Sequence, residues 1–152
     1  MDRENVRVRP GRDRKEHESL RRAAPRHVPC CSAPPMQLLD VETFQPALAS
    51  GIVLVDCWAP WCDPSRVFLS IYQAASTRHP GVTFANINAD REPRLTAALR
   101  ISTIPTLLAF RDRTLVYMHS GFLLAEALDL LVQRLRRLDM TAVRRKLATF
   151  AG

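Results

Sequence analysis

The stretch Trp58-Ala59-Pro60-Trp61-Cys62-Asp63-Pro64-Ser65 follows an apolar run at residues 52–55 and precedes a segment with helical periodicity. A cysteine at such a strand-to-helix transition meets unpaired N–H groups and the positive end of the helix dipole, which favour the thiolate over the thiol. Pro64 fits the first turn of a helix, because the N–H that proline lacks has no intrahelical partner there. Cys62 is therefore the candidate nucleophile, and a helix is predicted to begin at or next to it.

Asp56 is the one carboxylate in an apolar run over residues 52–58, whose pattern is typical of a strand buried on both faces. Burial raises the pKa of a carboxyl group, and an acid with a raised pKa near a thiol could shuttle its proton. Asp56 could equally be a polar core residue bridged by water, and the residues leave both interpretations open. Cys57 faces the opposite side of the strand by alternation and is interpreted as a small core residue.

The remaining periodicity predicts alternating strands and helices along the chain. The predicted elements are a strand at 37–39, a helix capped by Asp40 and running to about 49, a strand at 52–58, a helix at 62–77, a strand at 82–88, a helix at 93–99, strands at 106–110 and 115–119, and a helix at 124–138. Five leucines spaced by four and three residues should form the core face of the last helix: Leu124, Leu128, Leu131, Leu135 and Leu138. Arg144-Arg145-Lys146 indicates a further basic turn.

The stretch around Cys62 resembles the active-site turn of the thioredoxin family, and the resemblance covers about residues 36–138. Asp56 matches the buried carboxylate beneath that family's active site. Ile104-Pro105-Thr106 matches the cis-proline loop that faces the nucleophile, and Gly121 matches the glycine of the neighbouring substrate loop. The resemblance implies an α/β thioredoxin fold, in which a central mixed β-sheet is flanked by helices on both faces, with a cis peptide before Pro105.

The chain departs from the family at the second position of the C-x-x-C motif, where it carries Ser65. A hydroxyl can donate a hydrogen bond to the Cys62 thiolate, but it cannot form the disulfide that completes the usual reaction. Asp63 replaces the usual glycine, and its negative charge should partly offset the helix dipole. Asn86 stands where family members often carry a lysine, a change that should leave Asp56 more easily protonated.

The 152 residues suit one domain with extensions at both ends. We expect a disordered basic extension at residues 1–35, a thioredoxin-like domain at 36–138 and a basic extension at 139–152. Of the net charge of +7, residues 1–35 carry +4 and residues 134–146 carry +5, so the remainder sums to −2. This placement, without interleaved aromatic residues, argues against nucleic-acid binding. No apolar run approaches the roughly 18 residues that span a bilayer, so no membrane association is expected.

The four cysteines do not form a disulfide framework in a chain of this size, and no secretory signal is present, which predicts a cytoplasmic location. Cys30 and Cys31 could be a second redox pair or supply a resolving thiol for Cys62, but we favour the interpretation that they are two incidental thiols. His27 beside them lacks the spacing of a structural zinc site, so neither a metal nor a cofactor is predicted.

The leading function is thiol-disulfide exchange by a monothiol variant of the thioredoxin family. The expected catalytic residues are Cys62, Ser65 and Asp56. The expected substrate surface consists of Trp61, Pro64, Ile104, Pro105 and Gly121. The substrates would be protein disulfides or thiol adducts, with a low-molecular-weight thiol or a reductase as the reductant, and the chain should act as a monomer. The alternative is a redox-inactive binding or chaperone-like module that uses the same groove.

Overall fold

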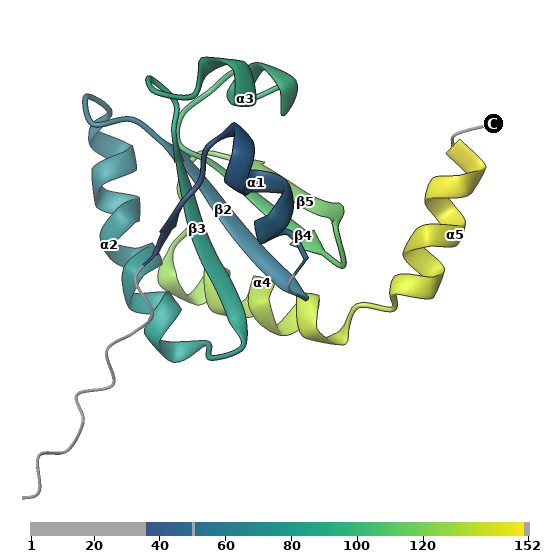
Figure 1. The fold of residues 1–152 in the computed structure, drawn as a ribbon. Coiled ribbons are helices and arrows are strands. Elements are labelled where there is room, and N and C mark those ends of the chain that lie inside the picture. The colour runs from purple at the N-terminus through teal and green to yellow at the C-terminus, as the bar shows by residue number, and fades with distance from the viewer. Residues whose placement is uncertain (1–35, 50, 151–152) are drawn as a thin grey trace, which may run out of the picture. The chain divides into compact units, whose positions relative to one another are not determined.

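The computed structural model describes residues 36–49 and 51–150, all within a compact unit that spans residues 33–152 (Figure 1). The predicted disordered extension at 1–35, with His27, Cys30 and Cys31, lies outside the described residues. None of the described helices is long and apolar enough to cross a membrane.

A five-stranded mixed sheet forms the centre of the fold, in the order β1-β3-β2-β4-β5. The strands are β1 (Gln37–Leu38), β2 (Ile52–Trp58), β3 (Val82–Asn88), β4 (Thr106–Arg111) and β5 (Thr114–Ser120). Strands β1, β3 and β2 run parallel, whereas β4 pairs antiparallel with β2 and β5 pairs antiparallel with β4. The predicted mixed sheet is confirmed, and β2 lies at its centre.

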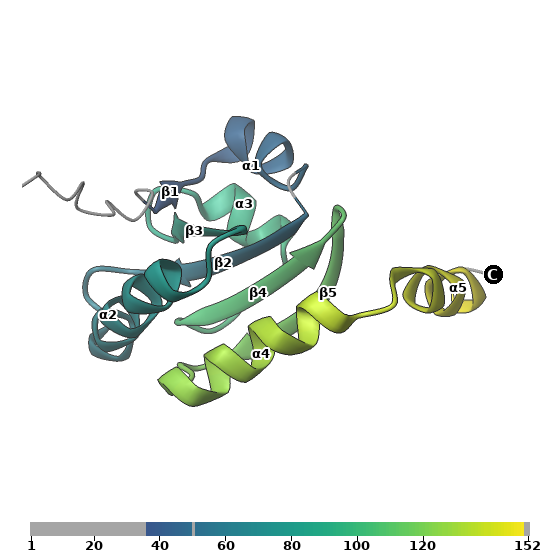
Figure 2. The same cartoon turned by 90° about the horizontal axis from the view of Figure 1, so that it is seen from below.

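Within residues 36–49 and 51–150, five helices accompany the sheet: α1 (Val41–Ala47), α2 (Asp63–Arg78), α3 (Pro93–Ala98), α4 (Ala125–Arg137) and α5 (Met140–Phe150). Figures 1 and 2 show α2 and α4 on one face of the sheet and α1 and α3 on the other. Asp40 caps α1 as predicted, since its Oδ1 accepts hydrogen bonds from the N–H groups of Glu42 and Thr43 at 2.9 and 2.8 Å.

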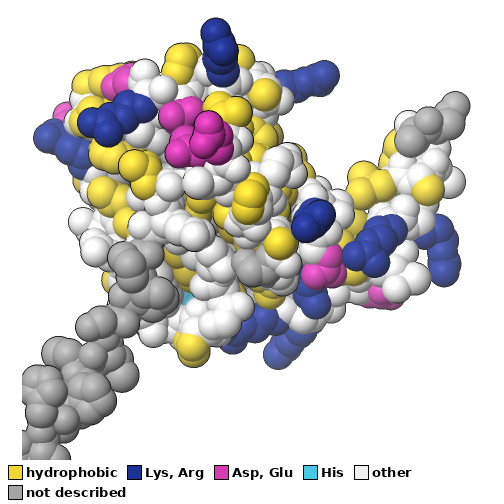
Figure 3. All heavy atoms as spheres, in the orientation of Figure 1, with side chains coloured by type: hydrophobic (Ala, Val, Ile, Leu, Met, Phe, Trp, Pro, Cys, Tyr) yellow, Lys and Arg dark blue, Asp and Glu magenta, His cyan; other side chains and the backbone are white. Residues whose placement is uncertain are grey.

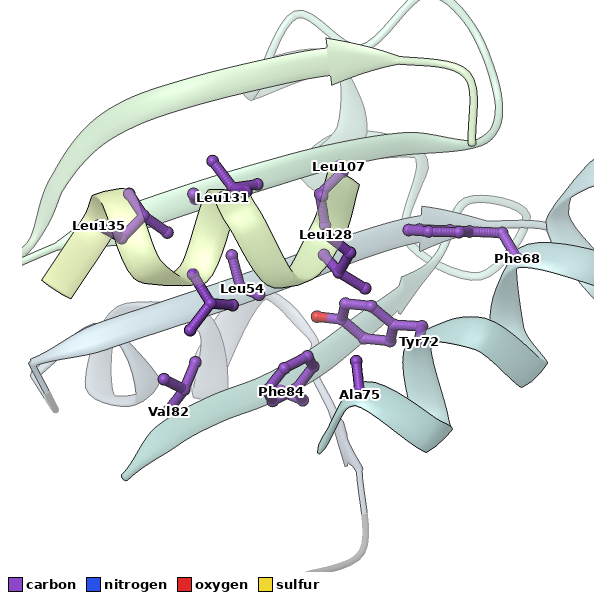
Figure 4. Packing of buried hydrophobic residues seen from close by; sticks show 12 residues of the cluster. Leu54, Phe68, Tyr72, Ala75, Val82, Phe84, Leu107, Leu128, Leu131 and Leu135 are labelled. Carbon is purple, nitrogen blue, oxygen red and sulfur yellow. The ribbon is translucent and has the colours of Figure 1, made fainter. Parts of the chain in front are cut away.

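Strand alternation divides the core into two clusters, one on each face of the sheet. Leu54 belongs to the cluster beneath α2 and α4, where the Tyr72 and Phe84 rings meet with centroids 5.0 Å apart (Figure 4). Cys57 is fully buried in the cluster beneath α1 and α3, which confirms its assignment as a core residue. The two faces of β2 are thus both covered, as its continuous apolar pattern indicates.

Helix α4, predicted to span residues 124–138, differs from the prediction at its start. Leu128, Leu131 and Leu135 are buried as expected, but Leu124 is 62% exposed. Leu124 precedes α4 in an extended conformation, with φ −68° and ψ 158°, so it does not share the helical face of the other leucines. Beyond α4, the expected basic turn is the 11-residue helix α5.

Candidate active site

Cys62 lies where the centre of the sheet gives way to α2. Strand β2 ends at Trp58, and Cys62 occupies the position just before α2 with an extended backbone, φ −92° and ψ 108°. Pro64 lies in the first turn of α2, as predicted. The cysteine is 9% exposed, and its Sγ lies 3.5 Å from the carbonyl oxygen of Ile104, to which the thiol donates. Cys62 is therefore held against a loop 42 residues away in sequence.

The loop that faces Cys62 contains Ile104 and Pro105, and it is hydrogen-bonded to Gly121, which follows β5. The Ile104–Pro105 peptide is cis, as the family resemblance implies. The N–H of Gly121, at the end of β5, donates to the Pro105 carbonyl at 2.7 Å. Gly121 has φ 101°, a conformation that favours glycine. The structure thus brings Cys62, Ile104, Pro105 and Gly121 together through direct contacts.

Trp61, next to Cys62 in sequence, is 67% exposed, and its indole N–H donates to a residue in the loop after β3. The Nε1 atom donates to both carboxylate oxygens of Asp90, at 3.0 and 3.1 Å. Sequence reasoning missed Asp90 as a partner of Trp61. It also missed Phe122, a 45% exposed aromatic residue directly after Gly121. The available signal was position: β2 and β3 are parallel neighbours, so the segments that follow them meet at the same edge of the sheet.

Asp56 lies below this surface and is fully buried. Neither carboxylate oxygen has a hydrogen-bond partner among the described residues. Burial raises the pKa of Asp56 from 3.8 to about 7. Asn86 lies opposite Asp56 in the β2–β3 register, and its Oδ1 is likewise buried and unpartnered within the described residues. An amide at this position supplies no positive charge to hold Asp56 ionised.

Ser65 is also fully buried, in the first turn of α2. Its hydroxyl has no hydrogen-bond partner among the described residues, so it makes no hydrogen bond to the protonated Cys62 thiol, and the bond expected with the thiolate stays a prediction. In this protonated state the Cys62 thiol donates to the Ile104 carbonyl. Asp63 forms an exposed ion pair with Arg66, a partner that offsets the charge next to Cys62 and that sequence reasoning missed.

The second described cysteine is chemically distinct from Cys62. Burial, followed by the charge of Asp56, raises the pKa of the Cys57 thiol to about 12. A thiol of that kind is protonated near neutral pH and is a poor nucleophile. Within the described part of the chain, no group of three His, Cys, Asp or Glu residues could hold a metal ion. The arrangement therefore offers one reachable thiol, on a surface of exposed rings and backbone polar groups.

Comparison with known proteins agrees with this geometry. The family profile described as "Thioredoxin" matches residues 35–134. A Streptomyces coelicolor protein named "Putative thioredoxin 2" is 36% identical over 111 residues, which cover 72% of this chain and 83% of that protein. The thioredoxin of Chlamydia trachomatis is 35% identical over 77 residues, or 51% of this chain and 76% of that one. The crystal structure of chloroplastic thioredoxin z has the same fold, with a TM-score of 0.63 at 23% identity over 68% of this chain and 96% of that one. The chain belongs to the thioredoxin family.

Proposed function

We propose that this chain exchanges thiols and disulfides through Cys62 alone, with an external thiol completing each cycle. The observation that carries the proposal is the contact of the Cys62 Sγ with the Ile104 carbonyl, 3.5 Å away, at the amino end of α2. A thiol in this place meets the helix dipole from one side and backbone that can pair with an extended substrate from the other. Ser65 in place of a second thiol restricts the chain to one reactive sulfur at this site.

The reaction has two balanced steps. The Cys62 thiolate attacks one sulfur of a substrate disulfide, so that a bond between Cys62 and that sulfur forms while the substrate's S–S bond breaks and the other sulfur leaves as a thiolate. An external thiolate then attacks the mixed disulfide and releases Cys62 as a thiolate. The external thiol ends in a new disulfide with the bound sulfur, and Cys62 is unchanged over the cycle. A low-molecular-weight thiol or a reductase in the reducing cytoplasm supplies this second thiolate.

The surrounding residues bind substrate and handle the proton. Five residues form the substrate surface: Trp61, Pro64, Ile104, Pro105 and Gly121. The unpartnered hydroxyl of Ser65 donates to Cys62 once the sulfur is ionised and releases Ile104. Asp56, with its pKa of about 7, takes up and returns a proton beneath the site near neutral pH. The substrates are protein disulfides or thiol adducts, and the chain acts as a monomer.

A second candidate function is binding without turnover. The specific observation that favours it is the exposure of two aromatic side chains at the site, Trp61 at 67% and Phe122 at 45%. Exposed rings beside a backbone-lined loop can hold an extended protein segment without chemistry. In this case Cys62 contacts the bound segment and does not take part in catalytic thiol-disulfide exchange.

Intact mass and peptide mapping after incubation with glutathione disulfide distinguish these functions. The test uses the full chain carrying Cys30→Ser and Cys31→Ser, with Cys62→Ser added as the matched control. We expect one glutathione adduct, located on Cys62, that free glutathione removes. The control should form none. An unreactive Cys62, in a chain whose circular dichroism shows it folded, would rule out exchange and leave the binding function.

The Ser65→Cys substitution supplies an independent test of the same site. We expect this variant to form a disulfide between residues 62 and 65 and to reduce insulin with dithiothreitol faster than the unmodified chain does, because the thiol at position 65 releases the mixed disulfide within the molecule. An inactive Ser65→Cys variant, despite a reduced and folded chain, would mean that the surroundings of Cys62 no longer support exchange.

A further inference from the structure

Helix α5 is a well-formed helix with one apolar face. The Asp139 side chain caps it, because its Oδ1 accepts hydrogen bonds from the N–H groups of Thr141 and Ala142 at 2.9 and 3.2 Å. Four apolar residues recur at spacings of three, four and three, which places them on one face of the helix: Met140, Val143, Leu147 and Phe150. We call these four residues the α5 stripe.

The α5 stripe is covered only at its start. Met140 is 8% exposed, whereas Leu147 is 47% and Phe150 is 87% exposed. A helix as short as about 12 residues is marginal in water, and most of its stability in a protein comes from covering its apolar face. The uncovered half of the α5 stripe is therefore a surface on which a further contact would stabilise the helix.

Positive charge borders the α5 stripe on both sides. At 100° per residue, Arg144 lies about 40° beyond Met140 on one side, and Lys146 lies about 40° beyond Phe150 on the other. Arg145 projects from the opposite side of the helix. Arg144 remains 60% exposed although its guanidinium lies 3.6 Å from Asp112. The helix carries no acidic residue, and Figure 3 shows Lys and Arg side chains beside hydrophobic ones on α5.

An apolar stripe flanked by cations fits some binding partners better than others. A second copy of α5 would bring the same bordering cations against each other, which costs energy. Nucleic acid would use the cations but would leave the aliphatic stripe exposed, and no second aromatic residue on α5 offers stacking. The surface of an anionic bilayer accepts both features, because apolar side chains enter the headgroup boundary while flanking Lys and Arg contact lipid phosphates.

We infer that α5 binds the surface of anionic membranes, with the α5 stripe facing the lipid and Arg144 and Lys146 contacting headgroups. The 11 residues of α5 are shorter than the roughly 20 that span a bilayer, so the helix lies along the surface. The inference goes beyond thiol exchange and does not depend on it, since none of its residues lies at the Cys62 site. It departs from the sequence expectation of no membrane association, which considered only runs long enough to span a bilayer and not a helix that lies along its surface.

The test is flotation of the full chain with vesicles of phosphatidylcholine alone and of phosphatidylcholine mixed equally with phosphatidylglycerol. We expect binding to the mixed vesicles only, weakened by added salt. Lys146→Gln should lower the partition coefficient about fivefold, the usual effect of one cation near the surface. Arg145→Gln removes the same charge from the far side of the helix and is the matched control, with a smaller expected loss.

The apolar contact is tested with Leu147→Ser, for which we expect a loss of about tenfold or more. Leu130→Ser, at a 54% exposed leucine of α4, is its matched control and should bind as the unmodified chain does. Circular dichroism would establish that each variant is folded. No binding to mixed vesicles, or an equal effect of Leu147→Ser and Leu130→Ser, would overturn the inference. So would a lipid-independent dimer that Leu147→Ser abolishes, because the α5 stripe would then be a self-association surface.

Discussion

Replacement of Asp56 by asparagine should stabilise the fold at neutral and alkaline pH by up to about 4 kcal/mol. Asp56 is fully buried, and its carboxylate has no hydrogen-bond partner in the described part of the chain. Ionising it in the folded state is therefore costly, which is why burial raises its pKa from 3.8 to about 7. At about 1.36 kcal/mol per pH unit, the difference between these values corresponds to about 4 kcal/mol. Asparagine has a similar shape and never ionises, so the Asp56→Asn variant avoids this cost.

The sign of the pH dependence follows from proton binding. Between about pH 4 and pH 7, the folded chain retains a proton on Asp56 that the unfolded chain has released. The contribution of Asp56 to stability is therefore greatest below its unfolded pKa, and it falls by about 1.4 kcal/mol per pH unit until the folded pKa is passed. The advantage of Asp56→Asn should be near zero at about pH 4 and reach its full size above about pH 7.

Urea unfolding followed by far-ultraviolet circular dichroism measures this difference across that pH range. With a typical denaturant dependence for a small domain, about 4 kcal/mol moves the midpoint by roughly 2 M urea. Asp63→Asn is the matched control, because Asp63 is an exposed carboxylate with a 79% accessible side chain. Its unfolding midpoint should follow that of the unmodified chain at every pH. Parallel curves for Asp56→Asn and the unmodified chain from acid to alkaline pH would refute a buried carboxyl group with a raised pKa.

Three further perturbations test the packing around the site. Cys57 should react with iodoacetamide far more slowly than Cys62 in the folded chain and at a similar rate in urea, as peptide mass spectrometry would show, because it is fully buried. Tyr72→Phe should lower the free energy of unfolding by about 1 kcal/mol in urea titrations, since the phenol loses its 3.0 Å hydrogen bond to a β3 carbonyl. Leu128→Ala should cost about 3 kcal/mol in the same assay, whereas Leu124→Ala, at a 62% exposed position, should cost little.

The sheet was predictable from sequence because its signals are local. The bounds of β2 and β3 agree with the predicted strands, and each strand begins directly after a glycine with positive φ, Gly51 or Gly81. The start of α4 was not predictable in the same way. Leucine spacing continues back to Leu124, but no side chain caps the helix there, and the helix begins one residue later. Helix α5 did carry a readable signal, the capping residue Asp139 before an apolar stripe.

The backbone features of the site were predictable from its motifs, whereas the hydrogen-bond partners of its side chains were less so. The position of Cys62 before α2 and the cis bond before Pro105 agree with the family resemblance. The hydrogen bond from Ser65 to the Cys62 thiolate stays a prediction, because the structure contains the protonated thiol, which donates to a carbonyl on a distant loop. The bond from Trp61 to Asp90 depends on two strands being neighbours, which a linear pattern does not state.

In the described part of the chain, a disulfide formed on Cys62 has no second thiol to release it. Ser65 carries a buried hydroxyl, and Cys57 is fully buried in the core cluster on the α1 and α3 side of the sheet. Where a second thiol is built in, the lifetime of a mixed disulfide is a fixed property of the protein. Under the exchange proposed for Cys62, this lifetime would lengthen as the concentration of external thiols falls, because release by an external thiol is second order. With a hydroxyl in place of a second thiol, the lifetime of the Cys62 adduct would thus report the concentration of reducing thiols around the protein.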